Sequence, residues 1–180
     1  MPVSELKISP EKKIALDGGF AAAFGGTPDA YFSAPGRTEV GGNHTDHQRG
    51  HVLAGAVNLD TVAAVRKNGT SFIRILSKGY PLCQVNLTEL TPVAEEVNTT
   101  PALIRGVAAR FAQLGCKVEG FDAYCESTVL PGSGLSSSAA YEVLIGTIIN
   151  CLFFEKRFPS RKSPRLASML RTCSSGSPAA

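Results

Sequence analysis

The sequence predicts a mixed α+β domain, because the expected strands come mostly first and alternate with helices only in the second half. Three kinds of pattern support this prediction: apolar runs with strand periodicity, amphipathic helical spacing, and turn residues between them. The expected strands cover residues 57–65, 72–76, 83–87 and 121–127, and the expected helices cover residues 10–24, 101–114 and 138–154. A regular doubly wound sheet would instead show strand–helix alternation throughout.

The first helix is marked at both ends. Pro10 suits its first turn, Ser9 can cap it, and Gly25-Gly26 follows its last residue. Residues 31–37 are then short and extended, and residues 36–50 are dense in Gly, His, Asp and Asn. We therefore expect a polar loop from residue 36 to residue 50.

The central strands differ in their patterns. Val and Ala run almost continuously through residues 57–65, which predicts a strand buried on both faces. Asn68-Gly69 follows and is a strong hairpin signal, so we expect the strand at residues 72–76 to pair with this one. The helix at residues 101–114 then places its Leu, Ile, Val and Phe residues on one face.

Composition and charge exclude several classes of protein. With 180 residues the chain has room for one domain, and its net charge of +3 is too small to indicate a nucleic-acid partner. No apolar run approaches the ~18 residues of a membrane span, and Met1–Lys13 lacks the apolar centre of a secretory signal. The five cysteines form no close pair. We therefore expect a cytoplasmic protein with reduced thiols and no membrane partner.

A first polar cluster lies within residues 36–51. Its carboxylates, imidazoles and amides are groups that pair with the several hydroxyls of a sugar, and its glycines let a ligand approach the backbone. A solvated polar loop is one alternative, and a metal site built from the histidines and Asp46 is another, although their spacing fits no standard metal site. The cluster consists of Arg37, Glu39, Asn43, His44, Asp46 and His47.

A second cluster, Val129–Ala140, joins a strand to an apolar helix. Gly132 and Gly134 permit a tight loop whose N–H groups point inward, and the helix start adds free N–H groups and the positive end of its dipole. Together they predict a cradle for phosphates, and the serine hydroxyls beside it could ligate Mg²⁺. The alternative is an ordinary strand–helix connection with a serine cap, and the lack of a Lys excludes a standard P-loop.

Two motifs in these clusters resemble one family, the galactokinases of the GHMP kinase superfamily. Gly36-Arg37 with His44-Thr45-Asp46 resembles the galactokinase signature, and the loop from Pro131 to Ala140 resembles the phosphate loop of GHMP kinases. They stand in the family's order, and the resemblance covers residues 34–156. It implies the GHMP kinase N-terminal fold, a mixed β-sheet with helices on one face, incomplete in this chain and spanning residues 1–156.

The resemblance also implies roles for individual residues. ATP and Mg²⁺ would be the cofactors, and galactose would be the substrate, phosphorylated at its C1 hydroxyl. Arg37 would orient the substrates and stabilise the transferring charge, while Asn43, His44 and Asp46 would bind sugar hydroxyls. One of two serines, Ser137 or Ser138, would lie near Mg²⁺. The phosphates would be wrapped by Pro131, Gly132, Ser133, Gly134, Leu135, Ser136, Ser137 and Ser138.

The chain departs from the family pattern at four positions of the signature. The family usually has Asn where Glu39 stands, Ile at Gly41, Glu at Asn43 and Tyr at His47. Asn43 can still meet a hydroxyl, but as a neutral group. These differences bear on which sugar is bound.

A catalytic base is the part of the family pattern that this sequence lacks. Galactokinases carry an Asp, in a segment after the phosphate-loop helix, that would accept the proton of the sugar hydroxyl. Neither that segment nor the C-terminal half occurs here, so we expect the chain as given to be inactive. Residues 157–180 are rich in Arg, Ser, Pro and Gly and are expected to be a disordered, non-family tail. Since codons can be chosen that turn this tail into a family-like sequence in another reading frame, we hypothesise a frameshift near Lys156, which gene sequencing tests.

Three functions therefore stay open. The chain is a galactokinase fragment, a non-catalytic sugar- or ATP-binding module, or another GHMP kinase that acts on a different small alcohol. Arg37 with His44-Thr45-Asp46 favours galactose over the third, and binding without ADP release would favour the second. We also expect poor folding, because missing core elements would leave the apolar face of Leu144–Phe154 uncovered.

Overall fold

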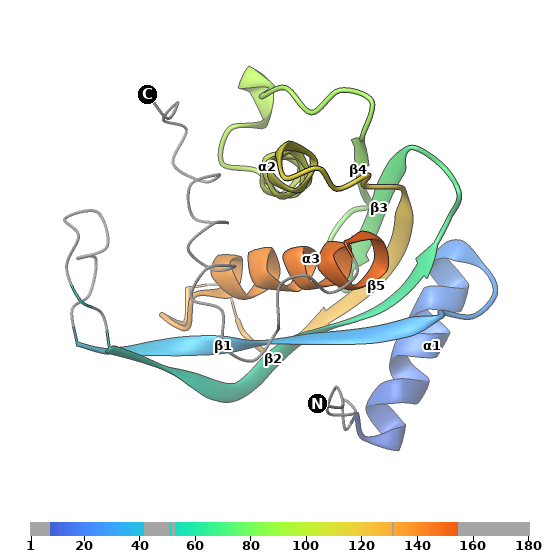
Figure 1. Ribbon diagram of the computed structural model, residues 1–180. Helices are drawn as coiled ribbons and strands as arrows, with labels where there is room; N and C mark the ends of the chain where they lie inside the picture. The colour runs from blue at the N-terminus through green and yellow to red at the C-terminus, as the bar shows by residue number, and fades with distance from the viewer. Residues whose placement is uncertain (1–7, 42–50, 52, 131, 155–180) are drawn as a thin grey trace.

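A computed structural model describes residues 8–41, 51, 53–130 and 132–154 of the chain (Figure 1). These residues form a mixed sheet with helices, which confirms the predicted α+β class. In the described part of the chain, no helix combines the length and apolar character needed to span a bilayer. The elements in order are α1 (Pro10–Phe24), β1 (Ala30–Gly41), β2 (Leu53–Lys67), β3 (Phe72–Ser77), β4 (Cys83–Asn86), the short 3₁₀ helix η2 (Ala94–Glu96), α2 (Thr100–Gln113), β5 (Phe121–Ser127) and α3 (Ser137–Phe153).

The five strands lie in the order β1-β2-β5-β3-β4. Strand β2 pairs antiparallel with β1 and with β5, while β5 pairs parallel with β3. The hairpin expected at Asn68-Gly69 is therefore wrong, because β5 separates the two strands that the turn connects. Figure 1 shows β5 crossing the middle of the sheet, with α3 above it.

The side chain of Asn68 explains why the turn does not close a hairpin. Its Nδ2 donates to the Asp122 carboxylate at 2.7 Å and to the Phe72 carbonyl at 3.0 Å, and its Oδ1 accepts from the Thr70 N–H at 3.0 Å. Gly120 lies against this turn so closely that a Cβ there would stand 2.4 Å from the Thr70 carbonyl oxygen. The turn thus carries the chain across the start of β5, and its polar groups are satisfied by that strand rather than by a hairpin partner.

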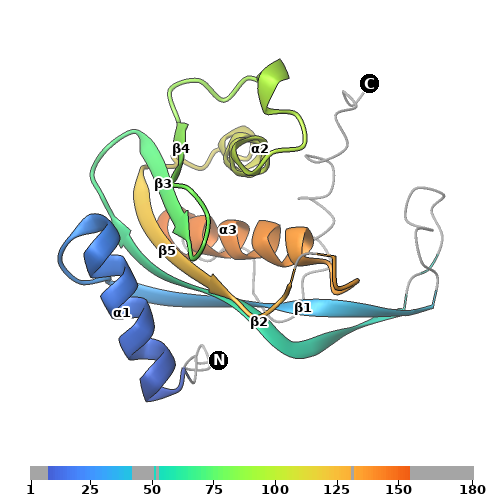
Figure 2. The same cartoon turned by 180° about the vertical axis from the view of Figure 1, so that it is seen from behind.

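Strands β2 and β5 bury both faces over residues 61–65 and 121–125, because helices cover both sides of the sheet there. One face packs against α2 and α3, through residues such as Ala63 and Ala123. The other face carries Val62, Ala64 and Tyr124, which pack against Leu16 and Phe20 of α1. The expectation that all helices lie on one face is therefore wrong for α1, which both views place across the sheet from α2 and α3 (Figures 1 and 2).

Strand β1 is longer than the sequence predicts. The expected loop at residues 36–50 begins as strand, because β1 continues to Gly41 and pairs Arg37 with Ala56 and Glu39 with Ala54. Two register shifts flank this paired stretch. Backbone hydrogen bonding to β2 outweighs the turn-forming composition of the segment, and the bulges turn the strand locally.

The expectation of an uncovered apolar face on α3 is also wrong for the residues described. Leu144, Ile145, Ile148 and Ile149 are all fully buried, and they belong to the same core as Phe111 of α2. The third helix therefore has its apolar side covered by the sheet and by α2. Cooperative folding of the chain itself stays untested by the structure.

Four of the five cysteines lie in the described part of the chain, and none of these four forms a disulfide there: Cys83, Cys116, Cys125 and Cys151. Burial raises the pKa of Cys125 to about 12. Burial, with a smaller contribution from Glu96, raises that of Cys83 to about 11. Both thiols are therefore protonated at neutral pH, where they are poor nucleophiles and poor metal ligands.

Two adjacent glycines of α1 test how this helix packs. A Cβ on Gly19 would stand 2.2 Å from ring atoms of Tyr124, whereas a Cβ on Gly18 would meet nothing within 4 Å. We expect Gly19→Ala to destabilise the chain by about 1–3 kcal/mol through overpacking, and Gly18→Ala to stabilise it by up to about 1 kcal/mol through helix propensity. Thermal or urea unfolding measures both, and equal effects of the two variants would contradict the packing of α1 on β5.

Candidate functional site

The two chemical clusters found in the sequence touch at the edge of the sheet. The backbone N–H of Arg37, in β1, donates to the Leu135 carbonyl at 3.1 Å, and Leu135 lies in the Gly/Ser loop between β5 and α3. A Cβ on Gly36 would stand 3.1 Å from Val129 and 3.2 Å from the Leu135 oxygen, so glycine lets the strand and the loop meet. The loop leads directly into the first turn of α3, which lies above β1 (Figure 1).

Several predicted site residues lie outside the described part of the chain. They are Asn43, His44, Asp46 and His47 of the first cluster and Pro131 of the second. Their distance from the loop is not established, and their roles stay predictions. The metal alternative for the first cluster falls mostly on these residues. Among the residues that are described, no group of three or more His, Cys, Asp or Glu side chains could hold a metal ion.

The backbone of the Gly/Ser loop has a pattern suited to anions. Three alternate residues adopt left-handed conformations: Gly132 and Gly134, both with φ of 74°, and Ser136, with φ of 55°. Alternation of left-handed residues with others can turn successive N–H groups toward one side and form an anion-binding concavity. The two glycines adopt this conformation without strain. At Ser136 the side chain makes the same conformation unfavourable by about 1 kcal/mol or more.

The start of α3 leaves its first-turn N–H groups without a side-chain cap. In α1 and α2 the caps Ser9 and Thr99 accept from the backbone of the first turn, but Ser136 at the start of α3 makes no such bond. The N–H of Ala140 is bonded to the Ser136 carbonyl at 3.0 Å. The serine-cap alternative from the sequence is therefore not what the structure has. The uncapped N–H groups and the helix dipole favour an anion at this point.

The serines of the loop differ in what they can offer a ligand. The N–H and the hydroxyl of Ser133 both donate to the Leu130 carbonyl, at 3.3 and 2.6 Å, so this side chain stiffens the loop. Ser137 and Ser138 open α3, and Ser138 is exposed to solvent. The last two serines are thus better placed to present an oxygen outward.

The residue at the entrance to the Gly/Ser loop, Thr128, is hydrogen-bonded to β2. The N–H of Thr128 donates to the Asp60 carbonyl at 2.9 Å, and the Asp60 N–H donates to the Thr128 hydroxyl at 2.9 Å. The side-chain carboxylate of Asp60 accepts hydrogen bonds from the Lys12 ammonium group and from the Ser33 hydroxyl, each at 2.7 Å. A link of polar contacts therefore runs from α1 through the sheet to the entrance of the loop.

An ion pair on β1 was missed by the sequence analysis. The Arg37 Nη2 lies 2.8 Å from the Glu39 Oε1, with exposed side-chain fractions of 34% and 19%. The Arg37 Nε is buried and has no hydrogen-bond partner in the described structure. Two residues apart on a strand, the side chains share one face. Had residues 36–41 been predicted as strand, the Arg-x-Glu spacing would have indicated the pair.

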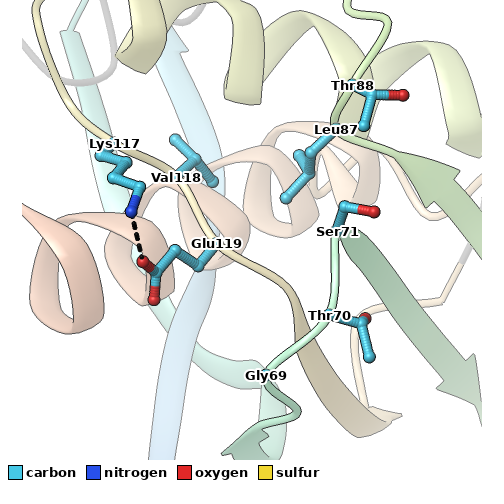
Figure 3. Close-up of a pocket in the computed structure, with 8 residues that line it drawn as sticks. All are labelled: Gly69, Thr70, Ser71, Leu87, Thr88, Lys117, Val118 and Glu119. Atoms are coloured by element: carbon cyan, nitrogen blue, oxygen red, sulfur yellow. Dashed lines mark ion pairs between the residues drawn. The ribbon is translucent and has the colours of Figure 1, made fainter.

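A separate hollow lies at the other end of the sheet (Figure 3). It encloses about 410 Å³ beside the turn after β2 and the segment before β5, whereas the Gly/Ser loop follows the far end of β5. Its charged groups, Lys117 and Glu119, pair with each other at 3.3 Å. The hollow is lined by Gly69, Thr70, Ser71, Leu87, Thr88, Lys117, Val118 and Glu119. It gathers none of the predicted site residues.

Two family models match the chain. One, described as the galactokinase galactose-binding signature, matches residues 19–67. The other, described as the GHMP kinases N-terminal domain, matches residues 102–179. The second match continues past Lys156 into the segment expected to be a tail, which lies outside the described residues, so the boundary at residue 156 stays a prediction.

Curated relatives and solved structures agree with these matches. The chain is 35% identical to a galactokinase of Lacticaseibacillus casei (strain BL23), over 75% of this chain and 35% of that protein. It is 32% identical to a galactokinase of Streptococcus mutans serotype c, over 79% of this chain and 37% of that protein. The chain thus spans about a third of the length of these curated relatives.

The crystal structure of Lactococcus lactis galactokinase complexed with galactose has the same fold, with a TM-score of 0.76 and 25% identity. The match covers 89% of this chain and 41% of that one. Methanococcus jannaschii mevalonate kinase, with a TM-score of 0.63 and 14% identity over 82% of this chain and 46% of that one, shares the fold alone.

Gly36→Ala is expected to loosen the contact between β1 and the Gly/Ser loop. The added methyl group would meet Val129 and the Leu135 oxygen at 3.1–3.2 Å, so the loop must give way by a few tenths of an ångström. Hydrogen–deuterium exchange at the Arg37 amide should become faster, because this N–H donates to Leu135. Gly55→Ala is the matched control, since a Cβ there meets nothing within 4 Å. Unchanged Arg37 exchange in Gly36→Ala would contradict the contact.

Proposed function

This chain belongs to the galactokinase family of the GHMP kinases, and we propose that it binds ATP and galactose as the phosphate-binding part of a kinase that phosphorylates the C1 hydroxyl of the sugar. One observation carries the proposal. The Arg37 N–H bonds to the Leu135 carbonyl, so the signature that resembles a sugar site and the loop that resembles a phosphate site are in contact. Phosphoryl transfer needs these two ligands side by side, because the attacking and leaving oxygens stand in line across one phosphorus atom.

The proposed ATP site is the segment from Gly132 to Ser138. Its left-handed residues and the uncapped start of α3 supply backbone N–H donors, which can hold phosphate oxygens without a lysine. Pro131 completes the motif by resemblance. The braced entrance at Thr128 fixes these donors before the ligand arrives, and preorganised donors are more effective than mobile ones.

Magnesium is proposed at the serines that open α3. Mg²⁺ prefers oxygen ligands and keeps several waters, and in nucleotide-binding loops of the P-loop type a Ser or Thr hydroxyl holds it together with the substrate phosphates. Ser137 or Ser138 fits this requirement, because both stand beside the uncapped helix start and the hydroxyl of Ser133 is already engaged. A bound Mg²⁺ would neutralise charge that develops on the phosphates.

The sugar is proposed to lie on the β1 side of the loop. Arg37 would orient the sugar and the transferring phosphate, and Asn43, His44 and Asp46 would pair with sugar hydroxyls. Arg37 alone of these four is described: its backbone N–H is bonded to the loop at Leu135, and its side chain is about one-third exposed to solvent. No residue of the chain is assigned as the base that accepts the hydroxyl proton. We therefore propose that a polypeptide of these 180 residues binds both ligands without transferring phosphate.

The test separates binding from turnover. Isothermal titration with Mg·ATP and with galactose should show binding of each, whereas a coupled assay for ADP release should show none above background. Release of ADP that depends on galactose would contradict the proposed lack of turnover and make the chain a kinase by itself. Failure to bind either ligand would contradict the proposed function as a whole.

A serine substitution tests the magnesium site. Ser137→Ala or Ser138→Ala should reduce the gain in ATP affinity that Mg²⁺ provides by about tenfold, the value of one lost charge-assisted contact. ATP affinity without Mg²⁺ should change little, because the phosphate donors are backbone N–H groups. Ser71→Ala, at the opposite end of the sheet, is the control. An unaltered Mg²⁺ dependence in both loop variants would place the ion elsewhere.

A further inference from the structure

Glu39 lies next to the proposed site and has no role in the proposed function. It is two residues from Arg37 on β1, and both residues pair with β2 in the short stretch between two register shifts. Bulges on either side of a paired stretch aim its side chains in a set direction. The carboxylate and the guanidinium therefore stand on one face of one paired strand segment, in which Arg37 is also the residue whose backbone N–H is bonded to Leu135.

The contact between the two side chains restricts the arginine. Its Nη2 is held by the Glu39 Oε1 at 2.8 Å, and its Nε is buried. An arginine side chain has many rotamers, so the guanidinium of Arg37 would sample many orientations without this contact. Two of its three nitrogens are thus confined by protein, while about a third of the side chain stays exposed to a ligand.

Burial indicates that the pair is more than a solvated surface contact. Glu39 is only 19% exposed, whereas Lys117 and Glu119, which also form an ion pair, are 89% and 49% exposed. Exposed pairs of the second kind contribute little, because water and salt screen them and two long side chains must be ordered. The Arg37–Glu39 pair is partly shielded and short, which is the geometry of a charge-assisted hydrogen bond that fixes a donor.

We propose that Glu39 is a positioning residue for Arg37: on a strand whose backbone is bonded to the Gly/Ser loop, its carboxylate holds the guanidinium in the orientation that receives a phosphate oxygen. This inference rests on the proposed function, because it takes phosphate as the ligand of Arg37. It assigns Glu39 no contact with the sugar or with ATP. The acceptor oxygen of Glu39 matters in this role, and its negative charge is secondary.

Two substitutions distinguish the effect of the Glu39 acceptor oxygen from the effect of its negative charge. Glu39→Gln keeps an oxygen that Arg37 can donate to but removes the charge, and Glu39→Ala removes both. Titration with Mg·ATP should show Glu39→Gln within about threefold of the unmodified chain, because the amide oxygen still accepts a hydrogen bond from the guanidinium. Glu39→Ala should bind about tenfold more weakly, as expected when one charge-assisted hydrogen bond is lost. Thr38→Ala, an exposed neighbour, is the control.

A double-mutant cycle tests whether Glu39 acts through Arg37. In an Arg37→Ala background, Glu39→Ala should cause no further loss of Mg·ATP affinity, because the group that it positions is gone. A further tenfold loss in that background would overturn the proposal, since Glu39 would then act by itself. Affinity that rises in Glu39→Ala would also overturn it and would make Glu39 a competitor of phosphate.

How firmly the Arg37 side chain is held can be measured in the absence of any ligand. In ¹⁵N NMR spectra of the full chain, the Nη2–H group of Arg37, which donates to Glu39, should exchange slowly with water, should stay slow in Glu39→Gln, and should become fast in Glu39→Ala. Slow exchange in Glu39→Ala would overturn the positioning role alone, leaving the proposed function intact. Absence of Mg·ATP binding by the unmodified chain would overturn the proposed function together with the role built on it. Melting temperatures of all variants control for unfolding.

Discussion

The position of β5 between β2 and β3 is the constraint on which the rest of the structure depends. The first five residues of β5 are buried, and the strand packs against α1 on one face and against α2 and α3 on the other. A buried carboxylate, Asp122, fixes its start. The Arg74 guanidinium donates two hydrogen bonds to it, each at 2.7 Å, and Asn68 donates a third. A buried charge is tolerated only when it is paired and bonded in this way.

The same strand delivers the Gly/Ser loop to the edge of the sheet. After Ser127 the chain is bonded to Asp60 of β2 through Thr128, then passes the buried Val129 and meets β1 at Gly36. From there α3 turns back over the sheet, with its N-terminus directed at the loop. The anion-binding backbone therefore owes its place to long-range pairing, whereas its shape comes from its own glycines and from the left-handed Ser136.

The site joins groups of two kinds. The backbone N–H donors at the loop and at the start of α3 do not depend on side-chain identity. Such donors can bind the phosphates of any nucleotide and do not distinguish between nucleotides. In the proposed function, the polar side chains of the first cluster are the part that would distinguish one hydroxylated substrate from another. Glu39 stands at the junction, where the family usually has Asn, and in the structure it faces Arg37 rather than solvent. A departure from the family pattern thus coincides with a defined contact.

The sequence by itself determined most of the helices and strands and the positions of the glycines that shape the loop. The cap Ser9, the glycines at 132 and 134, and the strand at 121–127 depend on residues a few positions apart, and local preference suffices to find them. Only the tertiary structure decided the rest. The place of β5, the opposite face taken by α1, the extension of β1 and the Arg37–Glu39 pair follow from pairings between segments distant in the chain. Such pairings are selected by burial and by completed hydrogen bonding over the whole sheet, so no local window of sequence contains them.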